Sequence, residues 1–591
     1  MASFRLIPIG LVFAFLASGQ NLPPRIFYTD LESGPNTGGE NNLGAFVTIY
    51  GGQFGTTRGS SQVSVGGGSV AAYKYWSDDK VVVQLGGGAK SGSIQVSTGS
   101  GASNTLPFTV RTGNIYCVAT SGSDSGAGTF AAGCFRSVTK ARDVLSAGDI
   151  VYLRNGVAQT SDDGNGWRSC LLLRNAGSSA RPIAIVGYPN ETATIGNQNV
   201  DYGVRGTGAA TYWVIANLKL LGHAGAVNIQ SNWRVVGNDI QCPGGDGAEA
   251  CAESPDGSYI TFLGNEVHNA GKLSSTKMYH AVYFSTNSNF IEVGWNYIHD
   301  NLACRGLQFH SSGGNNQYGL KVHDNRFENT RCDAINLATV DPSRGAIEIY
   351  NNTVINGGTG PHPNDGAANY ACIYFPGGAN GGPVGSGTID VYNNTFVNCG
   401  FSGAGNLGGG GIVIGGGSPN TSMRLRNNIF MQSNGRPYLF FWANGPVSGS
   451  NNLYFGNGGG PSQTSGNVNA DPKFTNLAAK DLTIQASSAA KDAGTAIPSL
   501  TMDYRGVPRP QGSGYDIGAT EYTDGTNAGS QVSCDVNSDG DVDEVDAQLA
   551  KAQVLENAAC TTDLDGDAAC TVIDLQRVIN ARFGGVCRVG Q

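Results

Sequence analysis

Charged side chains are scarce in this sequence. Only 14% of the 591 residues are charged, and 36 Lys and Arg against 45 Asp and Glu give a formal net charge of −9. No run of Lys and Arg provides the positive surface that phosphate binding needs, which argues against a nucleic-acid partner. After the first 20 residues, no stretch approaches the roughly 20 consecutive apolar residues that a membrane helix requires. We therefore expect no membrane span in the mature chain.

Helical periodicity is rare as well, whereas glycine is abundant, with 89 residues. Short β-branched runs separated by glycine favour extended structure, and the length predicts three or more domains. Residues 1–19, "MASFRLIPIGLVFAFLASG", combine an early Arg, an apolar run and small residues, which is typical of a secretory signal peptide. We therefore expect an extracellular protein whose 13 cysteines are candidate disulfides. Because 13 is odd, at least one thiol is expected to stay free or to pair elsewhere.

Residues 24–110 contain short alternating runs such as "AFVTIYGGQFG", "SQVSVGGGSV" and "TLPFTV". Their regular spacing predicts a small antiparallel sandwich. The stretches "FVTIYGGQFG" and "LPFTV" resemble the IPT/TIG immunoglobulin-like modules of secreted proteins. That resemblance implies a spacer or a carbohydrate-contact module rather than a catalyst.

Residues 113–525 begin with strand, loop and a short amphipathic helix in "SVTKARDVLS", where Val138, Ala141 and Val144 recur at three-residue steps. This order resembles the start of pectate-lyase-like right-handed parallel β-helices, in which such a helix covers the open first coil. Near the end, "DYRGVPRPQGSGYDIGATEY" resembles the terminal coil and tail of bacterial secreted β-helix proteins. Its charged side chains are more readily explained by closure of the last coil than by catalysis.

An internal repeat supports the β-helix. Aligning "RVVGNDI", "TFLGNEV", "EVGWNYI", "KVHDNRF", "EIYNNTV", "DVYNNTF" and "RLRNNIF" places one asparagine column at steps of 27, 31, 29, 27, 42 and 34 residues. The column contains Asn238, Asn265, Asn296, Asn325, Asn352, Asn394 and Asn428. Repeats of this length with one apolar alternation each indicate stacked coils. Asparagine suits the bend because it tolerates a left-handed backbone and its amide can bond the equivalent residue of the next coil.

A second strand column, "HAVYF", "RGLQF", "DAINL", "ACIYF" and "GGIVI", lies out of phase with the first. Each coil therefore contributes at least two strands, and residues in one phase stack about 4.8 Å apart. His280, Arg305 and Asp333 share one position, and Tyr283, Gln308, Asn336 and Tyr374 share another, with His310 two residues after Gln308. Polar and aromatic side chains aligned in this way suit a sugar polymer.

The candidate catalytic residues are Lys277, His280, Arg305 and Asp333, and the candidate substrate-binding residues are Tyr283, Gln308, His310, Asn336 and Tyr374. A lyase must neutralise a uronate carboxylate and remove the neighbouring proton with a base. Lys277, His280 and Arg305 are candidates for that base, and Arg305 can also clamp a carboxylate bidentately. Structural roles for Asp333, as the partner of Arg305, and for His280, as a buried histidine, stay equally open.

The stretch "CDAIN" resembles the "DDGID" calcium-binding motif of some β-helix pectate lyases, but with fewer acidic residues. Asp333 and Asn336 stand at matching places, but Cys332 replaces one acidic ligand, so a calcium ion there has weak support. A glycosidase would need two carboxylates, which Asp300, Asp324, Asp333 and Asp341 could supply, yet the clustered aspartates of polygalacturonase-type β-helices are missing. Cys304 and Cys332 share a phase and are predicted to form a disulfide.

The C-terminal tail contains two acidic loops, "DVNSDGDVDEVD" and "DLDGDAACTVID", after a linker at 526–532. Their spacing wraps oxygen ligands around calcium, with a glycine at position 6 of the first loop. The predicted ligands are Asp535, Asn537, Asp539, Asp541 and Asp546 in the first loop and Asp563, Asp565, Asp567 and Asp574 in the second. Ala568 replaces the glycine of the second loop, so this site is expected to be weaker.

Paired loops that end in Asp and lead into apolar-patterned helices resemble the type I dockerin, so residues 533–591 are expected to form such a module. The resemblance implies two Ca²⁺ ions and a cohesin-bearing scaffold as partner. Glu544 with Val545, and Val572 with Ile573, stand where dockerins commonly contact that partner, in place of the familiar Ser-Thr type. Four cysteines here, Cys534, Cys560, Cys570 and Cys587, can pair in three ways.

The sequence thus predicts a mainly β protein: an Ig-like sandwich, a right-handed parallel β-helix and a small helical EF-hand-like tail. The leading function is β-eliminating cleavage of an acidic, uronate-containing polysaccharide. Glycoside hydrolysis on the same fold and non-catalytic glycan binding at a surface or matrix are the alternatives, because fold alone does not fix chemistry.

Overall fold

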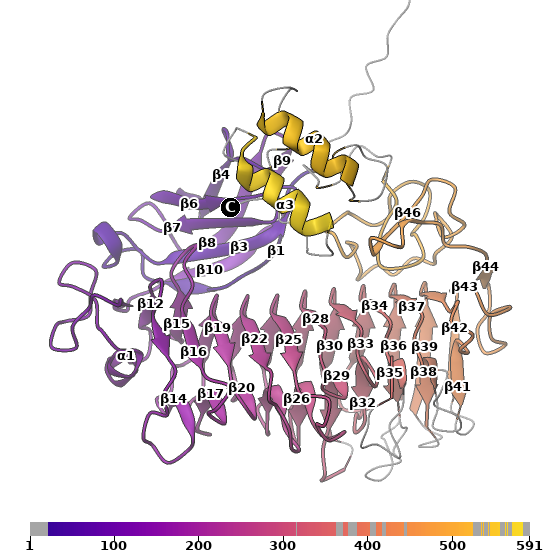
Figure 1. The fold of residues 1–591 in the computed structure, drawn as a ribbon, viewed down its shortest axis with the longest axis horizontal. Coiled ribbons are helices and arrows are strands. Elements are labelled where there is room, and N and C mark those ends of the chain that lie inside the picture. Colours follow the sequence, from indigo (N-terminus) through magenta and orange to yellow (C-terminus); the bar gives the residue numbers. More distant parts are fainter. Residues whose placement is uncertain are drawn as a thin grey trace, which may run out of the picture. The chain divides into compact units, whose positions relative to one another are not determined.

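The computed structural model describes residues 22–314, 316–361, 370–375, 387–401, 409–415, 421–441 and 446–523 and, in the C-terminal tail, 534, 536, 542, 544–555, 562, 564 and 570–582. The predicted signal peptide and linker lie outside these residues. Two compact units are formed: Pro24–Tyr522, and a second unit that includes Thr523–Gln591. Each unit is described by itself (Figure 1).

A sandwich that is antiparallel except for the parallel β2–β10 pair forms the N-terminal part of the first unit, as its alternating apolar runs predict. One sheet has the order β1 (Arg25–Thr29), β3 (Phe46–Gly52), β7 (Lys80–Gln84) and β6 (Ala72–Trp76). The other has the order β2 (Ser33–Gly34), β10 (Leu106–Val110), β8 (Gly92–Thr98), β4 (Gln62–Val65) and β5 (Gly68–Ser69), with β9 (Gly101–Ala102) paired to β8. A short 3-10 helix spans Glu40–Asn42.

Three long parallel sheets follow and wind as a parallel β-helix (Figure 1). Consecutive strands enter the first, second and third sheet in turn, so each full coil contributes three strands.

The first sheet contains β11 (Ile115–Val118), β12 (Ile150–Leu153), β15 (Ile183–Gly187), β18 (Trp213–Ala216), β21 (Arg234–Val236), β24 (Ile260–Leu263), β27 (Ile291–Gly294), β30 (Leu320–His323), β33 (Ile347–Tyr350), β36 (Gly387–Tyr392), β39 (Thr421–Arg426) and β42 (Val447–Ser450). The second contains β13 (Ala158–Gln159), β16 (Thr194–Gly196), β19 (Lys219–Leu221), β22 (Asp239–Cys242), β25 (Glu266–Ala270), β28 (Tyr297–His299), β31 (Arg326–Glu328), β34 (Thr353–Ile355), β37 (Thr395–Val397), β40 (Ile429–Met431), β43 (Leu453–Phe455) and β44 (Val468–Asn469).

The third sheet contains β14 (Ser169–Leu173), β17 (Tyr202–Gly206), β20 (Gly225–Asn228), β23 (Ala250–Ser254), β26 (His280–Ser285), β29 (Arg305–His310), β32 (Ile335–Leu337), β35 (Tyr370–Phe375), β38 (Gly409–Ile414) and β41 (Leu439–Phe441). A final hairpin pairs β45 (Phe474–Asn476) with β46 (Asp481–Ile484). Aliphatic and aromatic side chains from all three parallel sheets fill one continuous core.

The predicted amphipathic helix is present as α1 (Val138–Val144). Ser137 caps it, since its hydroxyl accepts a hydrogen bond from the backbone N–H of Lys140. Val138 and Ala141 are buried in the core of the β-helix. The helix therefore covers the first coil, as expected.

The asparagine column is a continuous hydrogen-bonded ladder. Asn325 illustrates its geometry: its Nδ2 donates to Oδ1 of Asn352 at 2.9 Å, and its Oδ1 accepts from Nδ2 of Asn296 at 2.8 Å. All seven predicted members take part, and Asn452 extends the ladder by one coil. The expected left-handed backbone lies one residue earlier, for example at Asn351 and Asn427, with φ of 52° and 54°. The column residues supply the amide bonds, and the preceding residues make the bend.

The sandwich and the first coils share one apolar core within the first unit. This core joins Phe46 of β3 to Tyr152, whose hydroxyl donates to the Phe46 carbonyl at 2.9 Å. A polar bridge beside it joins Asn217 to Asp30, with Nδ2 2.9 Å from Oδ2. Gly264 has a positive φ, and a Cβ there would lie 1.7 Å from the Tyr28 hydroxyl. Only glycine fits this close approach of the two parts.

The charged residues near the end of the first unit are structural. Arg509 and Glu521 form an ion pair whose side chains are both 0% exposed. The carboxylate of Asp503 accepts hydrogen bonds from the backbone N–H groups of Arg505, Val507 and Glu521. Backbone carbonyls of this segment also receive the amides of the bend residues, such as Asn351 to Met502. These bonds close the last coils, as the sequence predicts.

Four disulfides lie in the described part of the first unit: Cys117–Cys134, Cys242–Cys251, Cys304–Cys332 and Cys372–Cys399. The Cys304–Cys332 bridge confirms the prediction from their shared phase. Among the described residues, Cys170 is the free thiol, and it is buried in the β-helix core.

In the tail, α2 (Glu544–Val554) and α3 (Val572–Arg582) follow the two acidic loops. Ala547, Ala550 and Val578 pack with Cys534 and Leu564 in a small core. Both Cys534 and Cys570 are disulfide-bonded. None of the helices in the described residues is long and apolar enough to cross a membrane.

Candidate functional site on the third parallel sheet

The outer face of the third sheet carries a column of polar and aromatic side chains. Strand register aligns Arg205, Asn228, Glu253, Tyr283, Gln308, Asn336 and Tyr374, one from each successive strand. The four predicted members, from Tyr283 to Tyr374, are therefore neighbours, and three further residues extend the column toward the N-terminus. Neighbouring members lie about 4.8 Å apart, which is the spacing between adjacent strands.

The other predicted column also exists. His280 is in register with Arg305. Asp333 follows one coil later, where its carbonyl accepts a hydrogen bond from the Gly306 N–H, and the Cys304–Cys332 disulfide joins the two coils beside it. The structure thus places His280, Arg305 and Asp333 on successive coils, with Asp333 two residues before β32.

Arg305, Asp333 and Asn336 form one network. Nε of Arg305 lies 3.1 Å from Oδ2 of Asp333, and Nδ2 of Asn336 donates to the same oxygen at 2.7 Å. Burial raises the pKa of Asp333 above its ordinary value, although Arg305 and Asn336 oppose the shift. Asp333 is fully buried, so its observed role is to fix the guanidinium.

This network does not fit a calcium ion. The Oδ1 atoms of Asp333 and Asn336 are buried without a hydrogen-bond donor, which gives two acceptor oxygens. Calcium takes six to eight oxygens, and the guanidinium of Arg305 already neutralises the carboxylate. Among the described residues, no group of three or more His, Cys, Asp and Glu is placed to hold a metal.

His310 and Tyr283 form a pair on the exposed edge of this network. The Tyr283 hydroxyl lies 3.2 Å from Nδ1 of His310. Burial and the Arg305 guanidinium lower the pKa of His310 below its ordinary value. This shift favours the neutral imidazole, and both side chains are half-buried rather than covered.

Lys277 and His280 occupy different environments. Lys277 is half-buried and its carbonyl accepts a hydrogen bond from Nη1 of Arg305 at 3.3 Å. His280 is 0% exposed and meets the Tyr283 ring edge-on, with centroids 5.3 Å apart. In this arrangement His280 supports Tyr283 from beneath and does not face solvent.

The N-terminal members of the column were missed from the sequence. Arg205 lies over the rings of Tyr202 and Trp167, at 4.2 and 4.8 Å from their centroids, and Trp167 is 45% exposed. Glu253 accepts a hydrogen bond from Nδ2 of Asn228 at 2.7 Å. The signal was present: "YGVRG", "GAVN" and "ACAES" continue the phase of "HAVYF" toward the N-terminus.

The candidate glycosidase aspartates do not come together. Asp324 is buried beside His323, where Oδ2 lies 2.8 Å from Nδ1 of the imidazole. Asp300 instead contacts His299, the last residue of β28 in the second sheet, with 2.9 Å between Oδ2 and Nδ1. Asp341 caps a turn through Ser343, at 2.5 Å. With Asp333 committed to Arg305, these four residues supply no pair of carboxylates facing one bond.

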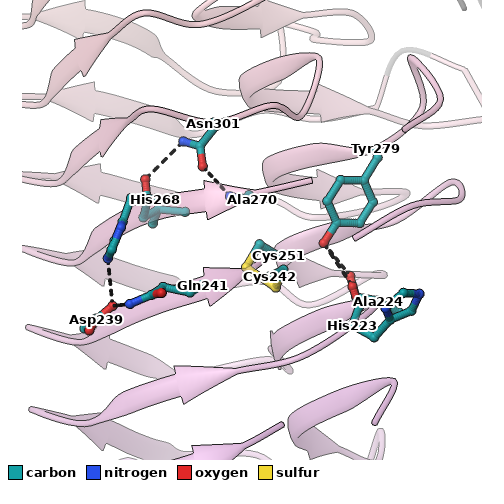
Figure 2. The surroundings of a disulfide bond; sticks show 11 residues. His223, Ala224, Asp239, Gln241, Cys242, Cys251, His268, Ala270, Tyr279 and Asn301 are labelled. Atoms are coloured by element: carbon teal, nitrogen blue, oxygen red, sulfur yellow. Dashed lines mark hydrogen bonds and ion pairs between the residues drawn. A yellow bond between two sulfur atoms is a disulfide. The ribbon is translucent and has the colours of Figure 1, made fainter. Parts of the chain in front are cut away.

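The outer face of the second sheet carries a separate histidine column. His268 and His299 stack with centroids 5.3 Å apart. Nε2 of His268 lies 3.0 Å from Oδ1 of Asp239 (Figure 2). A pocket of about 820 Å³ lies along the turns that follow this sheet, lined by Leu273, Ser274, Asp300, Asn301, Leu302, Asn329, Arg331, Thr359, Gly360 and Pro361. It does not include the residues of the column on the third sheet.

The final Asp of each acidic loop is buried and oriented in the same way. Oδ1 of Asp546 accepts from the N–H of Val536 at 2.7 Å, and Oδ1 of Asp574 accepts from the N–H of Leu564 at 2.6 Å. Each bond spans ten residues, back to position 2 of the loop. Buried carboxylates that fold back over acidic loops fit a calcium-binding role. The other predicted ligands, Asp535, Asn537, Asp539, Asp541, Asp563, Asp565 and Asp567, lie outside the described residues.

Comparison with known proteins identifies one module. Residues 32–110 match the IPT/TIG domain, which agrees with the sandwich predicted there. No curated protein sequence matches the chain.

Among solved structures, pectate lyase Pel9A is 15% identical, with a TM-score of 0.40 over 69% of this chain and 96% of that one. XylC, solved with xylose, is 12% identical, with a TM-score of 0.40 over 69% and 98%. An alginate lyase from Paenibacillus sp. str. FPU-7 is 14% identical, with a TM-score of 0.34 over 56% and 96%. At these identities and TM-scores, the likenesses carry no conclusion about what this chain does.

Proposed function

We propose that the outer face of the third sheet binds an acidic, uronate-containing polysaccharide and cleaves it by β-elimination. The observation that carries the proposal is the Tyr283–His310 pair beside Arg305. A neutral imidazole with a depressed pKa is ready to accept a proton at pH 7, and the Tyr283 hydroxyl holds its ring. In the aligned column on either side, the Tyr283 and Tyr374 rings are half-buried and could contact a polymer, whereas the amides of Asn228, Gln308 and Asn336 are buried beneath them.

His310 is the proposed base, in place of the earlier candidates. His280 is fully buried, and the charge of Arg305 is committed to Asp333. Arg305 still serves the reaction, because its positive charge adds to burial in lowering the pKa of His310. The ammonium group of Lys277, which forms no ion pair among the described residues, is the proposed partner of the uronate carboxylate.

The test is incubation of the full-length protein with a panel of uronate polymers, followed by ultraviolet absorbance for unsaturated products. Wild type is expected to generate such products, and His310→Gln is expected to lose them. His268→Gln is the matched control, because it changes an imidazole on the second sheet. New reducing ends without ultraviolet absorbance would indicate hydrolysis. Binding without any product would indicate the non-catalytic alternative.

For the tail, we infer a calcium-binding, dockerin-like module. The repeated Asp546 and Asp574 geometry supports it, and the ions would be held by these two residues together with the acidic side chains of each loop. Bound calcium would neutralise the clustered carboxylates and order the loops. Val572 and Ile573, 68% and 55% exposed, are apolar side chains at the proposed cohesin-facing positions. Retention of the protein on immobilised cohesin with calcium, and its release by a chelator, would support this partner.

Export from the cell completes the proposal. Four disulfides in the first unit suit an oxidising compartment, and residues 1–19 have the pattern of a signal peptide. Recovery of the mature protein from culture medium, with an N-terminus after residue 19, is the corresponding measurement.

A further inference from the structure

Glu253 is a half-buried carboxylate in the middle of the polar column. Strand register places it between Asn228 on β20 and Tyr283 on β26. Its own strand, β23, is fixed by the Cys242–Cys251 disulfide, which crosses from the second sheet to the third two residues before Glu253 (Figure 2). The carboxylate is therefore in register with Tyr283, the partner of His310, on a strand that is held in place.

Two buried amides orient this carboxylate. Nε2 of Gln230 donates to Oδ1 of Asn228 at 2.9 Å, and Nδ2 of Asn228 donates to Oε1 of Glu253 at 2.7 Å. Asn228 and Gln230 are 4% and 6% exposed. The backbone of Ala250 also bonds this carboxylate and, like the Asn228 amide, favours its ionised form.

The charged and titratable groups around Glu253 favour its protonated form. Burial and the nearby Glu249 raise its pKa to about 7, opposed by the Asn228 amide and the Arg205 guanidinium. Glu249 is itself held by the Tyr202 hydroxyl at 2.5 Å. The phenols of Tyr279 and Tyr283 also face the site and feel the charge of Glu253. A carboxyl that is partly protonated near pH 7 is matched to proton donation.

We propose that Glu253 is the general acid that protonates the leaving glycosidic oxygen. His310 takes the proton from the carbon next to the uronate carboxylate, and that electron pair forms the new carbon–carbon double bond. The bond from the β-carbon to the glycosidic oxygen breaks, and that oxygen takes the proton of Glu253. The step leaves His310 protonated and Glu253 ionised, and proton exchange with water restores both.

This inference rests on one part of the proposed function, namely that a glycosidic carbon–oxygen bond is broken. Hydrolysis also requires a proton on the leaving oxygen. The assignment of Glu253 is therefore distinguishable from the assignment of β-elimination.

The test compares Glu253→Gln with Glu266→Gln in the full-length protein. Glu266 lies on the second sheet, on a different face, so its variant controls for loss of one carboxylate. We expect kcat of Glu253→Gln to fall by about 100-fold or more, the usual contribution of a general acid, and its alkaline pH limb near 7 to disappear. Glu266→Gln is expected to keep both. Asn228→Ala removes a bond that favours the ionised form, so its alkaline limb should move upward.

A substrate analogue with a nitrophenyl ether at the β-carbon separates chemistry from folding. A nitrophenolate leaves without a proton, so Glu253→Gln should cleave this analogue at close to the wild-type rate. Equal loss on both substrates, or an unchanged alkaline limb, would overturn the assignment. Activity that produces no ultraviolet-absorbing product but still needs Glu253 would overturn β-elimination and leave Glu253 as the acid. If no polymer is cleaved, an ordinary carboxyl pKa for Glu253, measured by carbon NMR, would overturn the inference too.

Discussion

The Tyr283 hydroxyl lies 3.2 Å from Nδ1 of His310, on the adjacent strand of the third sheet. This contact orients the imidazole, and burial together with the Arg305 guanidinium lowers the pKa of His310. Because the acid form of His310 is disfavoured, the proposed base is neutral at pH values where an ordinary histidine would begin to take up protons.

The first prediction concerns this titration. Proton NMR should show His310 titrating below the ordinary histidine pKa of about 6.5. Arg305→Gln removes a positive charge, so the pKa of His310 should rise and the acid limb of the activity profile should move to higher pH. Lys321→Gln removes a more distant, exposed positive charge and should leave His310 unchanged. An equal shift in both variants would contradict a local effect of Arg305.

The second prediction concerns the asparagine ladder. Asn325 is fully buried and bonds both neighbouring coils, so Asn325→Ala removes the side-chain partner of one backbone carbonyl and one backbone N–H and one hydrogen bond from each neighbouring amide. Each unsatisfied buried group costs about 1–3 kcal/mol, and we expect a total destabilisation of roughly 3 kcal/mol or more. Urea unfolding followed by circular dichroism measures it. Asn199→Ala, at an exposed position, should change the midpoint little. A similar small change for Asn325→Ala would show that the ladder is not required for stability.

The ladder was predictable because the asparagine keeps the same position relative to the strands of each coil, although the loops between coils differ in length. Each coil needs a buried amide at the equivalent position, so the asparagine recurs regardless of the loop sequence between two coils. The same reasoning located the Cys304–Cys332 bridge and the aligned columns from His280 to Asp333 and from Tyr283 to Tyr374. The left-handed residue was misplaced by one position, because asparagines such as Asn351 and Asn352 are adjacent and sequence alone does not show which one bends.

Other features were not predicted because their signal is weaker. Glu253 and Arg205 lie in strands rich in Ala and Gly, where alternation is faint, although their phase continues the column. The apolar core that the sandwich shares with the β-helix has a clearer signal in the sequence. Strands such as "WVIA" and "ITFL" are apolar on both faces, which indicates that both faces are covered. Whether His280 or His310 could act as a base depended on their burial. The position of a residue in the repeat does not show how buried its side chain is.

The third prediction concerns His323, which is almost fully buried between Tyr350 and Trp295. Burial alone would lower its pKa, but hydrogen bonds to Asp324 and Glu292 outweigh burial and raise the pKa to about 9. A raised folded-state pKa stabilises the protein fully below the unfolded value of about 6.5, and this stabilisation is lost as the pH rises through 9.

His323→Gln should therefore be clearly less stable than wild type at pH 6, and the difference should shrink by pH 9.5. Thermal unfolding across this pH range measures the difference. His223→Gln is the control, because it changes a histidine that forms no ion pair among the described residues. A constant difference for His323→Gln would mean that its charge does not contribute to stability.

The last prediction concerns calcium binding by the tail. Asp546→Ala and Asp574→Ala each remove a buried carboxylate that closes one loop, so each should abolish one calcium-binding event in titration calorimetry of the full-length protein. Ala568 stands where the turn of such loops favours glycine, and a left-handed alanine costs about 1–2 kcal/mol. Ala568→Gly should therefore tighten the second site by roughly 5- to 30-fold. Ala569→Gly changes the adjacent residue, where the loop requires no left-handed backbone, and should not tighten binding. Equal effects of the two glycine variants would show that general loop flexibility, and not the conformation at position 568, sets the affinity of the second site.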